Sequence, residues 1–127
     1  MKRTLIAMIL CSAATAMPTV AFAADAEGAY GSQRPASCRE LVYELRSRDR
    51  TPVLINIRNW ISGYITAYNR QTAETFDILG IADFEAAMHS VENFCKARPL
   101  ENLAAAMEVV TEDLYKTRHQ TKRQAGR

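Results

Sequence analysis

The sequence predicts an all-α protein, a small four-helix domain with one disulfide, behind a secretory signal. Between residues 36 and 115, apolar residues recur at helical spacing almost throughout. Cys38 and Cys95 fall on the apolar faces of two different predicted helices. The N-terminal segment has the composition of a secretory signal, which would deliver both cysteines to an oxidising compartment. We therefore expect a Cys38–Cys95 disulfide in the mature chain.

The predicted signal peptide covers residues 1–23 and is cut after Ala23. It has a basic start, an apolar run over residues 5–17 and an Ala-x-Ala cleavage site. The apolar run is too short to span a bilayer as a stable helix. Cys11 would suggest a lipoprotein, but Leu10 stands where such a signal needs a small residue. We expect Cys11 to leave with the signal and no membrane segment to remain.

Three regions follow the signal. Residues 24–35 are small, polar and interrupted by glycine and proline, which predicts a flexible leader. Residues 36–115 form the helical domain, and residues 116–127 lack large apolar side chains and read as a basic disordered tail. Cleavage removes two of the 16 Lys and Arg residues and leaves 14 against 14 Asp and Glu. A neutral chain with an acidic body argues against a nucleic-acid partner.

The first two predicted helices have clear N-terminal signals. Ser37 followed by Glu40 is a capping box, and the apolar stripe of that helix fades after Leu45. Thr51 and Pro52 are suited to the cap and the first turn of the second helix. That helix carries a broad apolar face: Val53, Ile57, Trp60, Ile61, Tyr64, Ile65 and Tyr68.

The third and fourth helices are separated from the second by a packed loop over residues 73–82, which Gly80 interrupts. The third begins near Asp83 and ends before Pro99, because the residue before a proline avoids the helical conformation. Its inward residues are Phe84, Ala87, Met88, Val91, Phe94 and Cys95. Pro99 would open the fourth helix, whose seam has coiled-coil-like spacing: Leu100, Leu103, Met107, Val110 and Leu114.

The disulfide restricts how these helices are arranged. Cys38 begins the first helix and Cys95 lies near the end of the third, so an up-down bundle would put them at opposite ends. A disulfide requires the two Cα atoms to lie within roughly 7 Å of each other. Either the third helix runs in reverse, or short helices cross at steep angles.

The polar residues form no recognisable catalytic or metal-binding pattern. His89 falls on a solvated helix face and His119 in the tail, which gives no zinc-ligand spacing. Oxidised cysteines provide no thiolate nucleophile. Glu112 and Asp113 are adjacent and point in different directions, so they make a poor acid–base pair. We expect a protein that is not an enzyme and has no cofactor or metal.

The most distinctive stretch runs from Trp60 to Tyr68. Gly63 lies inside this helix, where glycine costs about 1 kcal/mol relative to alanine. We expect a packing reason: Gly63 and Ala67, four residues apart, would let another helix approach closely. The alternative is a partner-binding surface built from Trp60, Tyr64 and Tyr68.

The segment Val91–Leu103, with the sequence VENFCKARPLENL, resembles the HdeA/HdeB family, as do Cys38 at a helix start and the pair Thr51–Pro52. The resemblance covers about residues 37–115. It implies a small all-helical periplasmic protein with a signal peptide and one disulfide. It also implies a role in acid stress: a homodimer near neutral pH that loosens in acid and binds unfolding protein clients.

Two functions are therefore expected. An acid-stress chaperone-like protein would bind clients through apolar residues of the second and fourth helices: Ile57, Trp60, Ile61, Tyr64, Tyr68, Leu103, Met107 and Val110. Full protonation of carboxylates and histidines would take the mature chain from about 0 to about +16, which disfavours a compact state. The alternative is an immunity or inhibitor protein with a single protein partner, because the chain also resembles, more weakly, Tai-type periplasmic immunity proteins.

Overall fold

The computed structural model describes residues 25–126 apart from positions 26, 28 and 48–50. The predicted signal peptide and its cleavage site thus lie outside the described residues. The chain divides into two units, Met1–Tyr30 and Gly31–Arg127. In the first unit, the Asp25 carboxylate accepts backbone hydrogen bonds from Glu27 and Ala29, at 3.1 and 2.7 Å.

The second unit is all-α, as predicted. No named strand occurs in the described part of the chain, and its two isolated β-bridges pair Ser37 with Asn102 and Asp77 with His119. The helices are α1 (Cys38–Leu45), α2 (Pro52–Gln71), α3 (Phe84–Ala97) and α4 (Leu103–Leu114), and a 3-10 turn, η1 (Tyr115–Thr117), follows α4.

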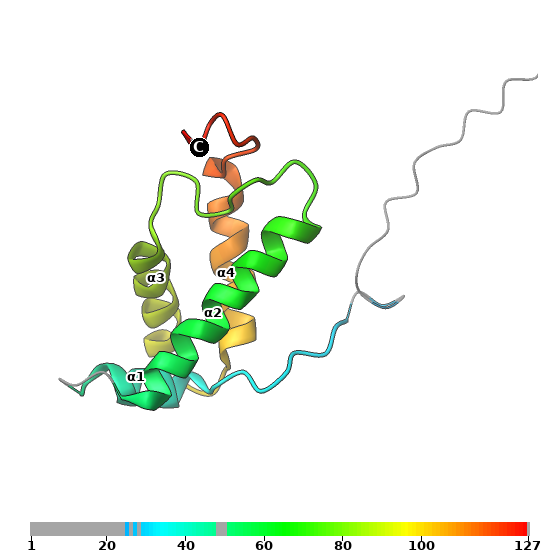
Figure 1. The fold of residues 1–127 in the computed structure, drawn as a ribbon. Coiled ribbons are helices and arrows are strands. Elements are labelled where there is room, and N and C mark those ends of the chain that lie inside the picture. The colour runs from blue at the N-terminus through cyan, green and yellow to red at the C-terminus, as the bar shows by residue number, and fades with distance from the viewer. Residues whose placement is uncertain (1–24, 26, 28, 48–50, 127) are drawn as a thin grey trace, which may run out of the picture. The chain divides into compact units, whose positions relative to one another are not determined.

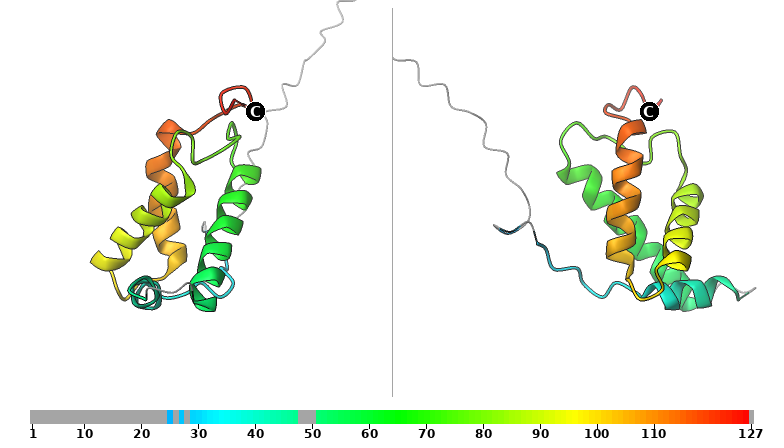
Figure 2. Two further views of the ribbon diagram at one scale, coloured as in Figure 1. Left: turned by 60° about the vertical axis from the view of Figure 1, so that its left-hand side comes forward. Right: turned by 180° about the vertical axis from the view of Figure 1, so that it is seen from behind.

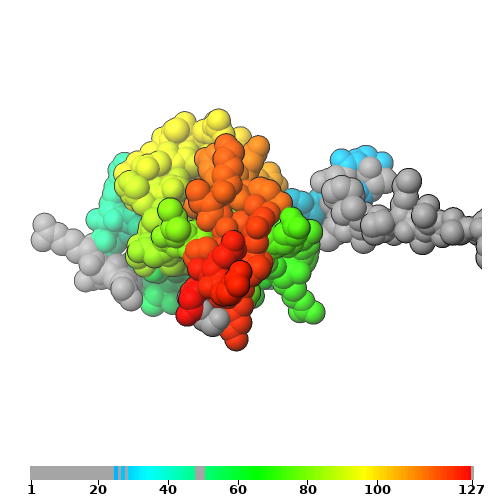
Figure 3. Space-filling view, turned by 90° about the horizontal axis from the view of Figure 1, so that it is seen from above, coloured from blue at the N-terminus to red at the C-terminus, as the bar shows by residue number. Residues whose placement is uncertain are grey.

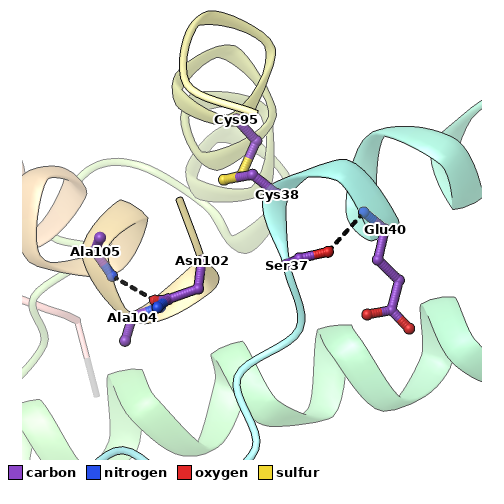
Figure 4. The surroundings of a disulfide bond; sticks show 7 residues. All are labelled: Ser37, Cys38, Glu40, Cys95, Asn102, Ala104 and Ala105. Carbon is purple, nitrogen blue, oxygen red and sulfur yellow. Dashed lines mark hydrogen bonds between the residues drawn. A yellow bond between two sulfur atoms is a disulfide. The ribbon is translucent and has the colours of Figure 1, made fainter. Parts of the chain in front are cut away.

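The short helix α1 lies across one end of the other three helices. Figures 1 and 2 show α2, α3 and α4 running lengthwise in alternating directions, with α1 beneath the end at which α2 begins and α3 finishes. This crossing brings the first residue of α1 to the last turn of α3. The Cα atoms of Cys38 and Cys95 are 4.6 Å apart and their disulfide forms (Figure 4). Of the two expected arrangements, the structure has the steep crossing.

Side-chain caps fix the start of three helices where the sequence predicts them. Ser37, Thr51 and Asp83 each accept a hydrogen bond from the backbone N–H three residues further on, at 2.7 to 3.1 Å. These bonds satisfy donors that the first turn leaves without a partner. The first residues of α1, α2 and α3 therefore follow from local sequence.

The expected start of α4 is wrong. Pro99 does not open the helix, which instead begins after Asn102, whose side chain caps it. Residues 101–103 pair with residues 36–38 through backbone hydrogen bonds of 2.9 and 3.0 Å, which an α-helical backbone could not make. Leu100, expected on the buried seam, is consequently 87% exposed.

The apolar face of α2 resolves into two rows with different burial. Ile57, Ile61 and Ile65 are buried against the other helices. Trp60, Tyr64 and Tyr68 form a neighbouring row that is only partly buried. The buried row joins one hydrophobic core with residues of the other helices and the connecting loop: Cys38, Leu41, Ile78, Met88, Val91, Cys95, Leu103, Ala106, Met107 and Val110.

The close helix contact expected at Gly63 is absent. Gly63 and Ala67 are exposed, and a Cβ atom built on Gly63 meets no heavy atom of a neighbouring element within 4 Å. The physical reason is the helical period: with Ile61 and Ile65 directed at the core, Gly63 falls on the solvent side. Gly63→Leu is therefore expected to be tolerated, whereas the close helix contact expected from the sequence would have made it strongly destabilising.

The expectation of a disordered tail from residue 116 is wrong for its first residues. His119 exchanges backbone hydrogen bonds of 2.9 and 3.0 Å with Asp77, and the Arg118 side chain donates to loop atoms at 3.1 Å. Figure 3 shows the red C-terminal residues against the green α2–α3 connection. We call this contact, residues 117–119 on residues 74–80, the C-terminal clasp. It is made of hydrogen bonds from the backbone and from an arginine side chain. Such contacts cannot be predicted from the number of apolar residues in a segment.

Candidate polypeptide-binding groove

A row of aromatic side chains lies along the exposed edge of α2. Trp60, Tyr64 and Tyr68 are spaced four residues apart, so the helical period places them on one face. The rings of Trp60 and Tyr64 have centroids 5.7 Å apart with planes tilted by 35°. Aromatic side chains at partly buried positions are typical of protein-binding surfaces, because each offers a large rigid apolar area.

The far end of this row opens into a hollow of about 480 Å³ between α2 and α4. Tyr64 and Tyr68 line it from α2, and Tyr115 of η1 lines it from the other side. Glu108 and Glu112 of α4 give it an acidic rim, and Lys116 and Thr111 complete the lining. The surface therefore combines apolar walls with negative charge.

The near end of the row opens into a second hollow, of about 430 Å³. Trp60 lines it together with two core residues, Ile57 and Leu103. The end of the predicted leader forms one wall, where the Trp60 indole N–H donates to the backbone oxygen of Gln33 at 3.0 Å. Arg34 and Pro35, the last residues of the leader, line the same hollow, so this part of the leader lies against the domain.

We call the surface formed by Trp60, Tyr64, Tyr68 and Tyr115 the aromatic groove. It contains three of the eight residues that the sequence singled out for binding. The other five are buried, each less than 5% exposed: Ile57, Ile61, Leu103, Met107 and Val110. The predicted set thus mixes a surface with the core beneath it.

Tyr115 is the groove residue that sequence reasoning missed. It lies at the boundary where the tail was expected to start, so its side chain was given no role. In the structure it is 38% exposed, and the Arg118 guanidinium stacks on its ring at 3.7 Å from the centroid. Arg118 also donates to the Tyr115 backbone oxygen at 2.7 Å. The C-terminal clasp therefore helps to fix one wall of the groove.

One ion pair connects α2 with α3. Arg58 donates to both carboxylate oxygens of Glu85, with Nη1 at 3.1 Å from Oε2, and its guanidinium lies 4.9 Å from the centroid of Phe84. The hydrogen bonds that Arg58 donates to the Glu85 carboxylate, together with the negative charge of Glu85, raise the pKa of Arg58 above its ordinary value. The Glu85 side chain is 69% exposed, so solvent screens the pair and its net contribution is at most about 1 kcal/mol.

The two histidines lie apart. The His89 side chain is 70% exposed, with Nδ1 at 3.8 Å from Glu92, in agreement with a solvated helix face. His119 sits in the clasp, and its Nδ1 is buried with no hydrogen-bond partner in the described part of the chain. No cluster of three or more metal-ligating side chains occurs among the residues that the structure describes.

No helix within the described residues has the length and apolar character needed to cross a membrane. No protein-family model, no curated protein and no solved structure matches the chain significantly. The aromatic groove is therefore interpreted from its own geometry: it provides apolar contact area, tyrosine hydroxyl groups and an acidic rim.

Proposed function

We propose that this protein is a chaperone-like polypeptide-binding protein of the periplasm, which holds apolar segments of unfolding clients in the aromatic groove. The observation that carries the proposal is the partly buried row Trp60, Tyr64 and Tyr68, which lines one hollow with Trp60 and another with Tyr64, Tyr68 and Tyr115. Its acidic rim favours client segments in which basic side chains flank apolar ones. The signal sequence and the disulfide support delivery to an oxidising compartment.

Acid stress is the proposed condition of action. The resemblance of the Cys95 segment to the HdeA/HdeB family supports it, and so does the charge swing of the mature chain. In acid, protonation removes the charge of Glu85 and with it the ion pair from α2 to α3. Loosening of α2 would add Ile57 and Ile61 to the aromatic groove, because these residues occupy the adjacent row of the same helix.

The test is light scattering of two unrelated clients that aggregate in acid, with and without an equimolar amount of the protein. The protein is expected to slow aggregation below about pH 4, near the pKa values of model carboxylates, and to release clients on neutralisation. Tyr68→Ser should weaken protection, since loss of an interface aromatic costs about 1–2 kcal/mol. Ile81→Ser is the control, because Ile81 is 85% exposed and lines none of the hollows described here.

Unchanged aggregation of both clients would contradict the proposal, as would equal effects of the Tyr68→Ser and Ile81→Ser substitutions. Near-ultraviolet dichroism and dye binding of the protein alone would report whether α2 loosens in the same pH range. A protein whose tertiary structure stays intact and whose clients aggregate normally is not an acid chaperone.

A second candidate is an immunity or inhibitor protein with one protein partner. The observation that favours it is that the aromatic groove is already open in the folded structure, so binding needs no acid-induced change. This candidate predicts tight binding to a single protein near neutral pH, and no general protection of clients. Products of the neighbouring genes are the first partners to test, by calorimetry with the Tyr68→Ser variant as control.

A further inference from the structure

A third hollow, of about 310 Å³, lies where α1 meets the end of α3 and shares no residue with the aromatic groove. Val42 and Tyr43 of α1 form one wall. Cys95 of the disulfide and Pro99, in the turn after α3, form the other. Tyr43 is 73% exposed and Leu100, next to Pro99, is 87% exposed. The hollow therefore has an apolar lining with large apolar side chains at its edge.

Three cations surround this apolar lining. Arg39 and Arg46 belong to α1 and stand seven residues apart, on the same face of the helix and about 10 Å from each other along its axis. Both are exposed, and neither makes an ion pair with any residue that the structure describes. Lys96 of α3 is the third cation, and it is paired with Glu92 at 2.6 Å. The two arginines thus carry the charge available to a partner.

The carboxylates of α1 do not neutralise these arginines in the structure. Glu44 accepts a hydrogen bond from the Thr51 hydroxyl, which occupies it at the start of α2. Glu40 lines the hollow beside Trp60, a different surface. One side of α1 is therefore basic and apolar, whereas its acidic side chains are directed elsewhere.

We propose that this hollow binds an acidic, apolar peptide segment of another protein. Its carboxylates would pair with Arg39 and Arg46, whose planar guanidinium groups suit two-point carboxylate recognition. Its apolar side chains would contact Val42, Tyr43 and Pro99. A concave lining with cations on both sides suits side chains that insert between them, whereas a flat lipid surface would reach only the rim. The partner of this hollow would be acidic, whereas the acidic rim of the aromatic groove favours basic segments.

The experiment measures binding of fluorescent glutamate–tyrosine copolymer to the purified protein by anisotropy, near neutral pH and at low and high salt. A lysine–tyrosine copolymer is the charge-reversed probe, and phosphatidylglycerol vesicles are the lipid probe. The double substitution Arg39→Ala with Arg46→Ala removes the two arginines. Arg70→Ala with Lys122→Ala is the matched control, since it lowers the net charge equally at sites outside the hollow.

The glutamate–tyrosine copolymer is expected to bind the wild type, and binding should weaken as salt screens the charges. Loss of both arginines should weaken it about tenfold, whereas the control pair should change it less than twofold. Tyr43→Ser should weaken it several-fold, and Tyr68→Ser should leave it unchanged, which separates this proposal from the proposed function.

Equal losses in the arginine variant and the control pair would overturn the proposal, because binding would then follow net charge alone. Preference for the lysine–tyrosine copolymer would also overturn it. Binding to vesicles without binding to the acidic copolymer would overturn the peptide proposal in favour of a lipid-binding surface. Self-association of the protein that the arginine substitutions abolish would overturn it in favour of a contact between two copies of this chain.

Discussion

The C-terminal clasp depends on a glycine, and Gly80→Ala is the most direct test of it. Gly80 has a φ of +58°, in the left-handed region that disfavours side chains. A Cβ atom at this position would lie 2.0 Å from the backbone oxygen of Thr117, closer than any real contact. The substitution must therefore strain the loop and also displace residues 117–119.

The size of the effect follows from these two parts. Left-handed backbone costs an alanine about 1–2 kcal/mol. Displacing the clasp also removes the three backbone hydrogen bonds between His119 and residues 76–77, each worth about 1 kcal/mol net. The total is about 4 kcal/mol, which corresponds to a fall in melting temperature of roughly 15–30 °C for a domain of this size. Gly63→Ala is the opposite case, because its helical, open position predicts a gain of about 0.5–1 kcal/mol.

Thermal and urea unfolding of the two glycine variants gives the comparison. Truncation after Lys116 then separates the two parts, since in the shortened protein Gly80→Ala should cost only the backbone strain. A Gly80→Ala variant as stable as the wild type would refute the reasoning. An equal cost in the full and truncated proteins would show that the clasp contributes nothing to it.

Three further changes have defined outcomes. Cys95→Ser opens a loop of 57 residues and should lower the free energy of unfolding by roughly 4 kcal/mol; a loss below 1 kcal/mol, with the thiol of Cys38 shown to be free, would argue against a stabilising bridge. Glu85→Gln should lower the free energy of unfolding by at most about 1 kcal/mol at neutral pH, and by nothing once the wild-type carboxylate is protonated. If the difference in unfolding free energy between the two proteins stays constant as the pH falls, the pair does not have this role. Trp60→Phe removes the indole donor to Gln33 and should increase proteolysis of the leader near residue 33 without changing the melting temperature by more than a few degrees.

The helices and the disulfide could be predicted because their causes are local. Ser37, Thr51 and Asp83 cap helices at the expected residues. Of the three cysteines, Cys38 and Cys95 are the two that remain once Cys11 is assigned to the predicted signal peptide, so the sequence predicts their pairing. The orientation of α1 could not be predicted, because it depends on which helix ends meet in space. The distance that a disulfide requires between its two Cα atoms only reduced the possible helix arrangements to two.

Two of the errors share a cause: backbone contacts between segments distant in sequence. The start of α4 moved to Leu103 because residues 101–103 pair with residues 36–38. The tail begins ordered because His119 pairs with Asp77. Neither pairing is marked in the sequence by an apolar periodicity or by a motif. The aromatic row was visible in the sequence, but the burial of Ile57 and Ile61 beside it was not, because two adjacent rows of one helix look like a single broad face.

The difference between the two rows of α2 bears on how the protein could respond to acid. The disulfide links α1 to α3 and does not depend on pH, and the most extensive helix contacts are those of α3 with α1 and α4. The side-chain ion pair that joins α2 to this group uses Glu85, whose charge acid removes. The raised pKa of Arg58 means that its own charge persists at every pH below the strongly alkaline range. Loss of the pair in acid therefore comes from the carboxylate alone.

Loss of this pair removes at most about 1 kcal/mol, so charge repulsion across the whole chain must supply most of the driving force for loosening. A state loosened in this way would keep α1, α3 and α4 together while α2 separates from them. The newly exposed surface would be continuous with the aromatic groove, because Ile57, Ile61 and Ile65 lie one row from Trp60, Tyr64 and Tyr68. It would also include Leu103 of α4, which lines one hollow together with Ile57. A small folded groove would then become a broad apolar surface on a scaffold that the disulfide holds closed, which is the property that a binder of unfolding clients requires.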